Sequence, residues 1–327
     1  MSTHRGRERA FLALKLLFLV GAVWFLLTKI RLADLKNSAS EVGLLTLLIA
    51  VAIESSGHFL DSLRQKIWLR NERPKVKFLS FVRARYLSSF LGNFLPSAFF
   101  SDAVRASFLT KEIGLGPESW ASTVMVRVVG LLVTFCIMVT GVTLGFAGVP
   151  DSSLSFRFLF VISVIFFSLI AFFLCLNASF IGWIEKKLGQ FVPVRYAKVT
   201  QSLVRFLVML GRYRSDVSGL VSVFLVSVVY QLTTVVMVAW ICHSVHVPVE
   251  PFKLLFQIPL ISLLVMVPAS INGIGIQDAS WIYLMGSSGV SVDKLLVISL
   301  VWHFARIAGT LPGGLVLLQF KKKNSQT

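Results

Sequence analysis

Two pairs of acidic and basic side chains, one pair in each half of the sequence, lie in or next to long apolar runs. Asp102 is followed by Arg127, and Asp278 is followed by Arg306. In each half a proline precedes the acid, and the arginine lies inside the next apolar run. Charges at membrane depth are costly and are usually kept for a function, so these four side chains are the first candidates for a binding site.

The first pair follows a proline break. Pro96 and Ser97 precede Asp102, and Arg105 follows three residues later. Proline favours the first turn of a helix, whose free amides favour an anion, so we predict a half-helix from about Ser97. Asp102 and Arg105 are spaced to form a pair on one helix face. The alternative is a kinked helix with a local ion pair and no ligand.

The second pair follows a glycine-rich segment. Pro268 is followed by Asn272, Gly273, Gly275 and then Asp278. Glycines permit positive φ angles and a close backbone approach, which suits a binding loop. No predicted strand precedes the segment and no phosphate-loop lysine follows it, so it is not a nucleotide-binding fingerprint.

Arginine stays charged and grips phosphate or carboxylate with a fork of donors. Arg127 and Arg306 could therefore hold a lipid phosphate, and could bind Asp102 and Asp278 when the site is empty. The alternative is that each arginine is permanently paired with an aspartate and joins the two halves.

A third group of ionisable residues lies along one helix face. Glu54, His58 and Asp61 are separated by four and three residues. Their spacing predicts a proton relay or the wall of a polar cavity. His303 precedes Arg306 by three residues and shares its predicted face, although such histidines are more often interior hydrogen-bonding groups.

Enzymatic chemistry has little support in the sequence. No hydrolase or metalloprotease motif is present, and Cys136, Cys175 and Cys242 lack the spacing of metal ligands. Arginines near Asp102 and Asp278 would keep both ionised, which argues against an aspartyl protease dyad. We expect no catalytic residue, no metal and no cofactor.

Composition places the chain in a membrane. Of its 327 residues 56% are hydrophobic and only 14% are charged, and the mean hydropathy is +0.80. Lys and Arg number 32 against 15 Asp and Glu. The basic residues cluster between apolar runs, which indicates cytoplasmic loops and anionic lipid rather than nucleic acid.

Apolar runs of about 20 residues can cross a bilayer as helices. Six runs meet this length or approach it, at residues 11–29, 43–63, 119–146, 157–177, 219–243 and 293–319. Basic clusters flank them at residues 5–9, 64–77, 186–214 and 321–323. The positive-inside rule puts these clusters, and both termini, on the cytoplasmic side.

Two further regions, about 78–110 and 252–290, are interrupted by proline and polar residues. Broken backbone is tolerated at membrane depth only where protein or a watery cavity surrounds it. We therefore predict two broken or re-entrant helical hairpins. Residues 1–147 and 148–327 then form an inverted repeat of an all-α polytopic protein, with residues 178–216 as an interfacial basic segment.

These motifs resemble the membrane part of the lysylphosphatidylglycerol synthase transmembrane (flippase-like) family. The resemblance covers nearly the whole chain and is carried by residues 93–97, 102–105, Arg127, Pro268, 273–278 and Arg306. The family usually has glycines where this chain has Phe100 and Ser101, and Arg-Glu where it has Gln277 and Asp278. The chain ends at Thr327, so we expect the aminoacyl-transferring domain of some members to be absent.

The resemblance implies a membrane protein that moves lipids, or lipid-linked intermediates, between leaflets. We expect an anionic phospholipid, an aminoacylated phospholipid or a polyprenyl-phosphate-linked lipid as its substrate. The predicted substrate-binding residues are Arg105, Arg127, Arg306, Asp102, Asp278, Pro96, Ser97, Asn272, Gly273 and Gly275.

Other functions remain open at this stage. The chain could be a non-catalytic subunit that presents a lipid-linked donor to a separate lipid- or glycan-modifying enzyme, or a carrier of small organic anions. The family and the absence of disulfide-type cysteines indicate a bacterial cytoplasmic membrane.

Overall fold

The computed structural model describes residues 40–72, 74–94, 98–114, 116–145, 197–266, 272–286 and 289–324, with short helical pieces between residues 160 and 187. Within these residues the chain forms helices and no strands, which confirms the predicted all-α class. The helices are α3 (Leu44–Trp68), α4 (Phe78–Gly92), α5 (Ala98–Ile113), α6 (Gly116–Gly145), α9 (Ala197–Ser215), α10 (Val217–Ser244), α11 (Pro251–Val265), α12 (Ile276–Met285), α13 (Val292–Thr310) and α14 (Pro312–Asn324).

Four of the predicted membrane spans are present as helices of sufficient length and hydrophobicity. They are Leu44–Trp68, Gly116–Gly145, Val217–Ser244 and Val292–Gln319, the last formed by α13 and the start of α14. The predicted span 11–29 lies outside the described residues, and the span 157–177 is described only in part. Six spans and cytoplasmic termini therefore stay predictions.

The helix of the second predicted span is longer than its apolar run. Helix α3 continues through Arg64 and Lys66 to Trp68, and the cytoplasmic side of this basic cluster stays a prediction. Arg64 is only 5% exposed. The apolar run ends near residue 63, but the helix does not, because Arg64 has buried partners elsewhere in the fold.

Both predicted hairpins are pairs of helices. Region 78–110 forms α4 and α5, and region 252–290 contains α11 and α12. The members of each pair pack on one another, and Ser101 Oγ on α5 donates a hydrogen bond to the carbonyl of Ser88 on α4 at 2.8 Å. The breaks fall near Pro96 and Pro268, which lie outside the described residues.

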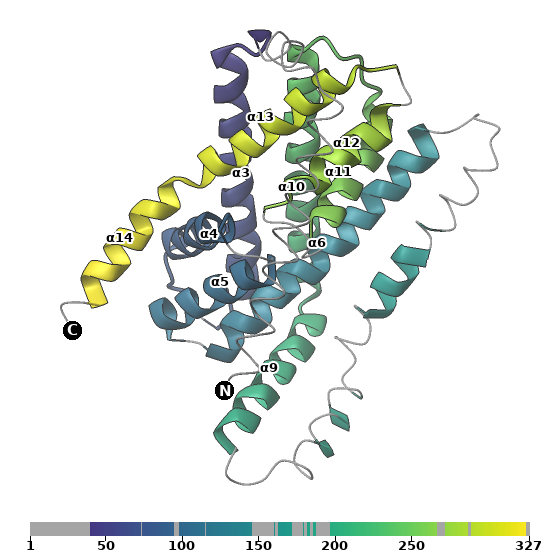
Figure 1. Cartoon of the computed structure of the whole chain (residues 1–327). Coiled ribbons are helices and arrows are strands. Elements are labelled where there is room, and N and C mark those ends of the chain that lie inside the picture. Colours follow the sequence, from purple (N-terminus) through teal and green to yellow (C-terminus); the bar gives the residue numbers. More distant parts are fainter. Residues whose placement is uncertain are drawn as a thin grey trace, which may run out of the picture.

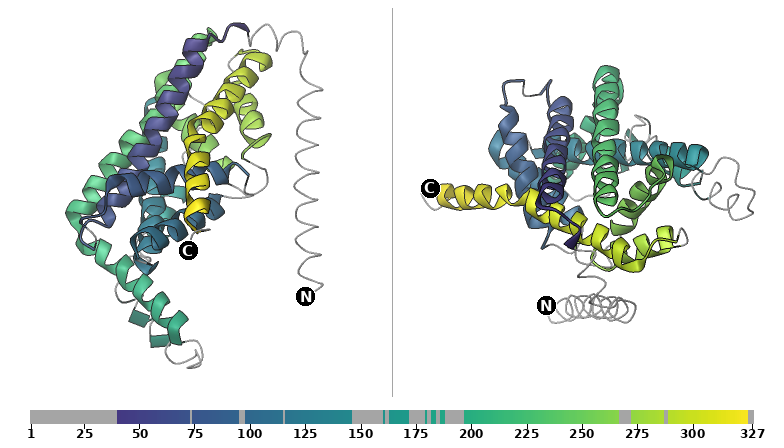
Figure 2. Two further views of the ribbon diagram at one scale, coloured as in Figure 1. Left: turned by 90° about the vertical axis from the view of Figure 1, so that its left-hand side faces the viewer. Right: turned by 90° about the horizontal axis from the view of Figure 1, so that it is seen from above.

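The element order suggests the predicted repeat. A long helix, a helix pair and a second long helix occur as α3, α4–α5, α6 and again as α10, α11–α12, α13. The long helices α3 and α10 run side by side, and α6 crosses the bundle against α11 (Figures 1 and 2). An inverted symmetry between residues 1–147 and 148–327 stays a prediction.

The bundle is held by apolar packing. The largest hydrophobic cluster joins α3, α10, α11, α12 and α13, and includes Trp281 and Trp302, whose rings are in edge contact. Smaller clusters join α6 to α9 and α10, α4 to α5 and α14, and α6 to α11. Helix association in lipid relies on such close van der Waals contact, because lipid tails are as apolar as the side chains that are buried.

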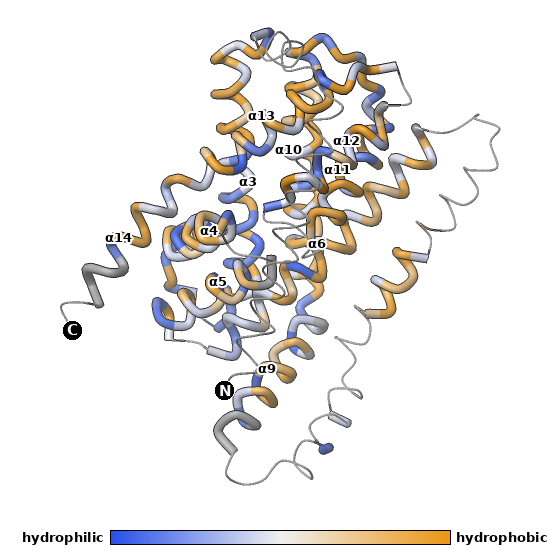
Figure 3. Tube along the Cα trace, in the orientation of Figure 1, coloured by the Kyte–Doolittle hydropathy of each residue, from blue (hydrophilic) through white to orange (hydrophobic). Residues whose placement is uncertain are grey.

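The exterior is also apolar. Leucines of α3 such as Leu44, Leu45 and Leu48 are exposed, as are valines of α10. Hydrophobic residues follow α6, α10 and α11 over most of their length, whereas α9 alternates between hydrophobic and hydrophilic positions (Figure 3). The helix α9 lies within the predicted interfacial segment 178–216, of which residues 188–196 lie outside the described part of the chain.

The start of α12 is built on positive φ angles. Asn272, Gly273 and Gly275 have φ of 52°, 78° and 85°. A Cβ on Gly273 would lie 2.5 Å from Val265 Cγ1, so the position requires glycine. The positive φ angles that these glycines permit are present in the turn that leads into α12, and a role of this segment in binding stays a prediction.

Asp278 closes this turn. Its Oδ2 accepts a hydrogen bond from the Gly275 amide at 2.8 Å, and the carboxylate lies in the first turn of α12. We expect Asp278→Ala to lower the free energy of unfolding by about 0.5–2 kcal/mol, the usual cost of losing a helix cap. Thermal denaturation of the purified protein in detergent would measure it. Asp278→Asn keeps an acceptor oxygen and is the control. An equal loss in both variants would contradict a capping role.

Candidate functional site

A polar cavity lies where the two helix pairs meet the long helices. It has two lobes, which share the side chains of Arg85, Asp102, Arg127 and Tyr230. Lobe one has a volume of about 310 Å³ and lobe two of about 260 Å³. Both helix pairs contribute residues to both lobes.

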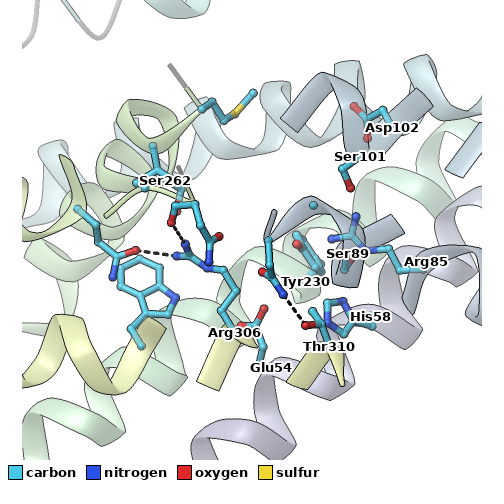
Figure 4. A pocket seen from close by; sticks show the side chains of 18 of the residues that line it. Glu54, His58, Arg85, Ser89, Ser101, Asp102, Tyr230, Ser262, Arg306 and Thr310 are labelled. Carbon is cyan, nitrogen blue, oxygen red and sulfur yellow. Dashed lines mark hydrogen bonds between the residues drawn. The ribbon is translucent and has the colours of Figure 1, made fainter. Parts of the chain in front are cut away.

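Lobe one is lined mainly from α3, α4, α5, α11, α13 and the turn before α12, with single residues from α6, α10 and α12. Glu54 lies beside Arg306, while Arg85 and Ser89 face the lobe from α4 (Figure 4). Asn93 Nδ2 donates to Thr310 Oγ1 at 2.8 Å and joins the end of α4 to α13.

Lobe two is lined mainly from α3, α5, α6 and α10. Its charged residues are Asp61, Arg64, Arg85, Asp102, Arg105 and Arg127. Its neutral polar residues include Thr123, Thr134, Ser227 and Gln231, and its apolar ones include Leu131 and Leu263.

Asp61 is the centre of a buried ion cluster. Its Oδ2 lies 2.7 Å from Arg105 Nη1 and 2.9 Å from Arg85 Nε, and its Oδ1 contacts Arg64 Nη2. Arg105 Nη2 also donates to the Asp61 carbonyl at 3.0 Å. One carboxylate therefore holds three guanidinium groups from α3, α4 and α5.

Arg64 makes further contacts across to α10. Its Nη1 donates to Ser227 Oγ at 3.2 Å, and its Cζ lies 4.3 Å from the centre of the Tyr230 ring. A guanidinium over an aromatic face is attracted by the ring quadrupole. The cluster thus fixes α3 against α10 as well as against the first helix pair.

Asp102 and Arg127 form the predicted pair in the first half. Arg127 Nε on α6 donates to Asp102 Oδ2 on α5 at 2.5 Å. Their side chains are 24% and 21% exposed, so the pair can be reached from the cavity. The sequence also allowed a pair between Asp102 and Arg105, but Arg105 is bound to Asp61 instead.

Arg306 is held differently from its counterpart. Its Nη1 donates to the Asn272 carbonyl at 3.1 Å and its Nη2 to Gln277 Oε1 at 2.6 Å. Both acceptors are neutral. Gln277 is oriented by Ser299, whose Oγ lies 3.0 Å from Gln277 Nε2. The two halves therefore differ, because Asp278 caps α12 and Arg306 hydrogen-bonds to Gln277.

The other predicted residues fall into three groups. Asn272 and Gly273 line lobe one, and Arg105 lines lobe two. Gly275 and Asp278 lie in the cap of α12, and His303 Nε2 is 3.8 Å from Asp278 Oδ1. Pro96 and Ser97 lie outside the described residues.

Glu54, His58 and Asp61 do not all line the same lobe of the cavity. Glu54 and His58 line lobe one, whereas Asp61 lines lobe two within the ion cluster. The predicted polar wall thus contains Glu54 and His58, and a proton relay through all three stays a prediction.

Sequence reasoning did not select Arg64, Arg85, Tyr230 or Gln277. Arg85 interrupts the apolar run of the first hairpin, and Arg64 follows Asp61 by three residues on the same helix face. These two sequence features could have identified Arg85 and Arg64 as candidate site residues. Gln277 had been noted only as a departure from the Arg-Glu of the family motif, and Tyr230 gave no signal that distinguishes it from an ordinary helix residue.

The composition, the helix pairs and the two motifs now allow comparison with known proteins. Residues 12–313 match the family described as the lysylphosphatidylglycerol synthase TM region. This chain belongs to that family. The match covers both helix pairs and all the arginines of the cavity. Membership in the lysylphosphatidylglycerol synthase TM region family indicates a multi-pass membrane protein involved in lipid handling. No curated protein matches the sequence.

Proposed function

We propose that this protein moves a lipid with an anionic headgroup between the two leaflets of a bacterial cytoplasmic membrane. The observation that carries the proposal is the cavity itself, in which Arg85, Arg127 and Arg306 line a polar space inside an apolar bundle. A guanidinium group recognises phosphate oxygens with directed donors. Such a space inside the bilayer suits a headgroup whose tails remain in the lipid.

In the proposed transport cycle, an acid of the cavity competes with the lipid phosphate for an arginine. Asp102 holds Arg127 while the site is empty, and a phosphate replaces it as the acceptor when the lipid enters. Arg306 lies beside Glu54 but donates its described hydrogen bonds to two neutral acceptors, which a phosphate in lobe one can replace. Movement of one half of the bundle against the other then exposes the cavity to each leaflet in turn, as in other inverted-repeat carriers.

Leaflet exchange in liposomes tests the proposal. The purified chain is reconstituted with labelled phosphatidylglycerol, its aminoacylated form or a polyprenyl phosphate, with and without an ion gradient. We expect exchange of at least one of these lipids. Arg127→Ala and Arg306→Ala should slow it at least about tenfold, because a hydrogen bond to a charged group contributes about 1.5–3 kcal/mol.

Arg83→Ala is the matched control. Arg83 lies on α4, pairs with Glu112 at 3.5 Å and lines neither lobe. The Arg83→Ala variant should exchange lipid at the same rate as the unsubstituted protein. Exchange that survives both cavity variants would overturn the arginine site. No exchange by a folded protein would favour a subunit that presents a lipid-linked donor to a separate enzyme.

A further inference from the structure

The charges that line the cavity do not balance. Among the described residues, the two lobes contain five guanidinium groups against three carboxylates. The guanidinium groups are those of Arg64, Arg85, Arg105, Arg127 and Arg306, and the carboxylates those of Glu54, Asp61 and Asp102. Even with every acid ionised, two positive charges are left over.

The breaks of the helix pairs do not supply the missing acids. Residues 95–97 are Leu-Pro-Ser and residues 267–271 are Val-Pro-Ala-Ser-Ile, so neither segment contains an ionisable side chain. Asp278 caps α12 and attracts Arg306 from outside the lining of the described cavity, so it does not compensate the arginines around Asp61.

The excess charge is located around Asp61, because this one carboxylate faces three guanidinium groups whereas Arg127 is paired with Asp102. The side chains of Arg64 and Arg105 are 6% and 2% exposed, so they are closed off from the cavity more than Arg85 is. Arg85 and Arg127 are 19% and 24% exposed and face both lobes. Since Arg85 shares Asp61 with two other arginines, its charge is only partly neutralised.

Two further polar groups in lobe one lack partners. Neither His58 Nε2 nor Ser89 Oγ makes a hydrogen bond within the described structure. His58 is 3% exposed and lines lobe one, as does Ser89. A buried polar atom without a partner costs free energy, and a ligand with several acceptor oxygens would relieve it.

We infer that the cavity selects a doubly charged phosphate group, a phosphomonoester or a diphosphate, over the singly charged phosphodiester of common phospholipids. Two uncompensated positive charges inside a membrane are costly, and a dianion bound at Arg85, where the two lobes meet, neutralises the excess around Asp61. A phosphomonoester carries about −1.5 to −2 at pH 7. The inference specifies the class of headgroup. That this headgroup belongs to a membrane lipid rests on the proposed function.

The sharpest test compares two lipids that differ by one methyl group. Phosphatidic acid presents a phosphomonoester, and phosphatidylmethanol presents a phosphodiester of nearly equal size with a single charge. Binding of short-chain forms to the purified full chain in detergent is measured alongside leaflet exchange of labelled long-chain forms. We expect phosphatidic acid to bind at least tenfold more tightly and to exchange at least tenfold faster.

Arg85→Gln should reduce the preference for phosphatidic acid at least tenfold, because it removes one of the two excess charges. Arg83→Gln, two residues away on α4 and paired with Glu112, should leave it unchanged. Loss of the preference in both variants would contradict a site at Arg85. Melting temperatures of both variants show whether each is folded.

The outcomes separate this inference from the proposed function. Equal binding and equal exchange of the two lipids would contradict selection of a doubly charged headgroup, but would agree with lipid translocation. Selective binding of phosphatidic acid without exchange would support the dianion and contradict translocation. Glycerol 3-phosphate that binds as tightly as phosphatidic acid would support the dianion and identify a soluble phosphomonoester, not a lipid, as the ligand.

Discussion

Replacing Asp61 by asparagine is expected to lower the free energy of unfolding by about 3–5 kcal/mol, the cost of breaking a buried ion pair from one side. Asp61 is 2% exposed and contacts three arginines from three helices. Asparagine has nearly the same shape and keeps one acceptor oxygen, but it carries no charge. The variant therefore leaves Arg64, Arg85 and Arg105 without their shared counter-ion.

The measurement is reversible unfolding in detergent, with Asp216→Asn as the control. Asp216 pairs with Arg70 at 2.7 Å, and the Arg70 side chain is 38% exposed. Asp216 also caps α10 through the Gly219 amide, a role that asparagine performs equally well. This exposed pair should contribute at most about 1 kcal/mol.

A double variant tests whether unpaired arginine charges cause the loss of stability in Asp61→Asn. Adding Arg105→Met to Asp61→Asn removes one of the unpaired charges, so the double variant should be more stable than Asp61→Asn alone. Similar stability losses for Asp61→Asn and Asp216→Asn would show that the three arginines do not depend on Asp61.

Gly141→Ala is expected to separate α6 from α11 and to lower the free energy of unfolding by about 1–3 kcal/mol, as overpacking usually does. A Cβ at Gly141 would lie 2.4 Å from the Phe256 amide nitrogen and 2.7 Å from the Leu255 carbonyl carbon. Backbone atoms cannot rotate away as a side chain can. The helices would have to move apart, and α6 carries Arg127.

Gly116→Ala is the control in the same helix. The nearest atom to a Cβ at Gly116 is Thr110 Cγ2 at 3.7 Å, an ordinary contact. Gly116 is the first residue of α6, where the helix preference of alanine over glycine has little weight, so this variant should be nearly neutral. A melting temperature for Gly141→Ala as high as that of Gly116→Ala would contradict the close α6–α11 contact.

The sequence alone determined the class of protein and the positions of the breaks. Apolar runs of sufficient length identified α3, α6, α10 and the α13–α14 region as candidate spans. The helix pairs were recognisable because proline and polar residues interrupt an apolar run in both halves. These are local properties, set by composition and backbone chemistry within a few turns.

Pairing between side chains was much harder to predict. The Asp102–Arg127 pair was anticipated because both charges lie in or next to apolar runs that must bury them. The equivalent pairing of Asp278 with Arg306 was expected by analogy, but Asp278 accepts the Gly275 amide and Arg306 binds Gln277. Repetition of residue types does not require repetition of contacts.

The tertiary structure decided which charges meet. Asp61 and Arg105 are 44 residues apart and Asp61 and Arg85 are on different helices, so their contact depends on how α3, α4 and α5 are rotated and packed. The total charge of +17 likewise did not predict the excess of positive charge in the cavity, since most basic residues lie elsewhere. The sequence gives the number of charged residues and their positions relative to the apolar runs. Their ion-pair partners depend on how the helices pack.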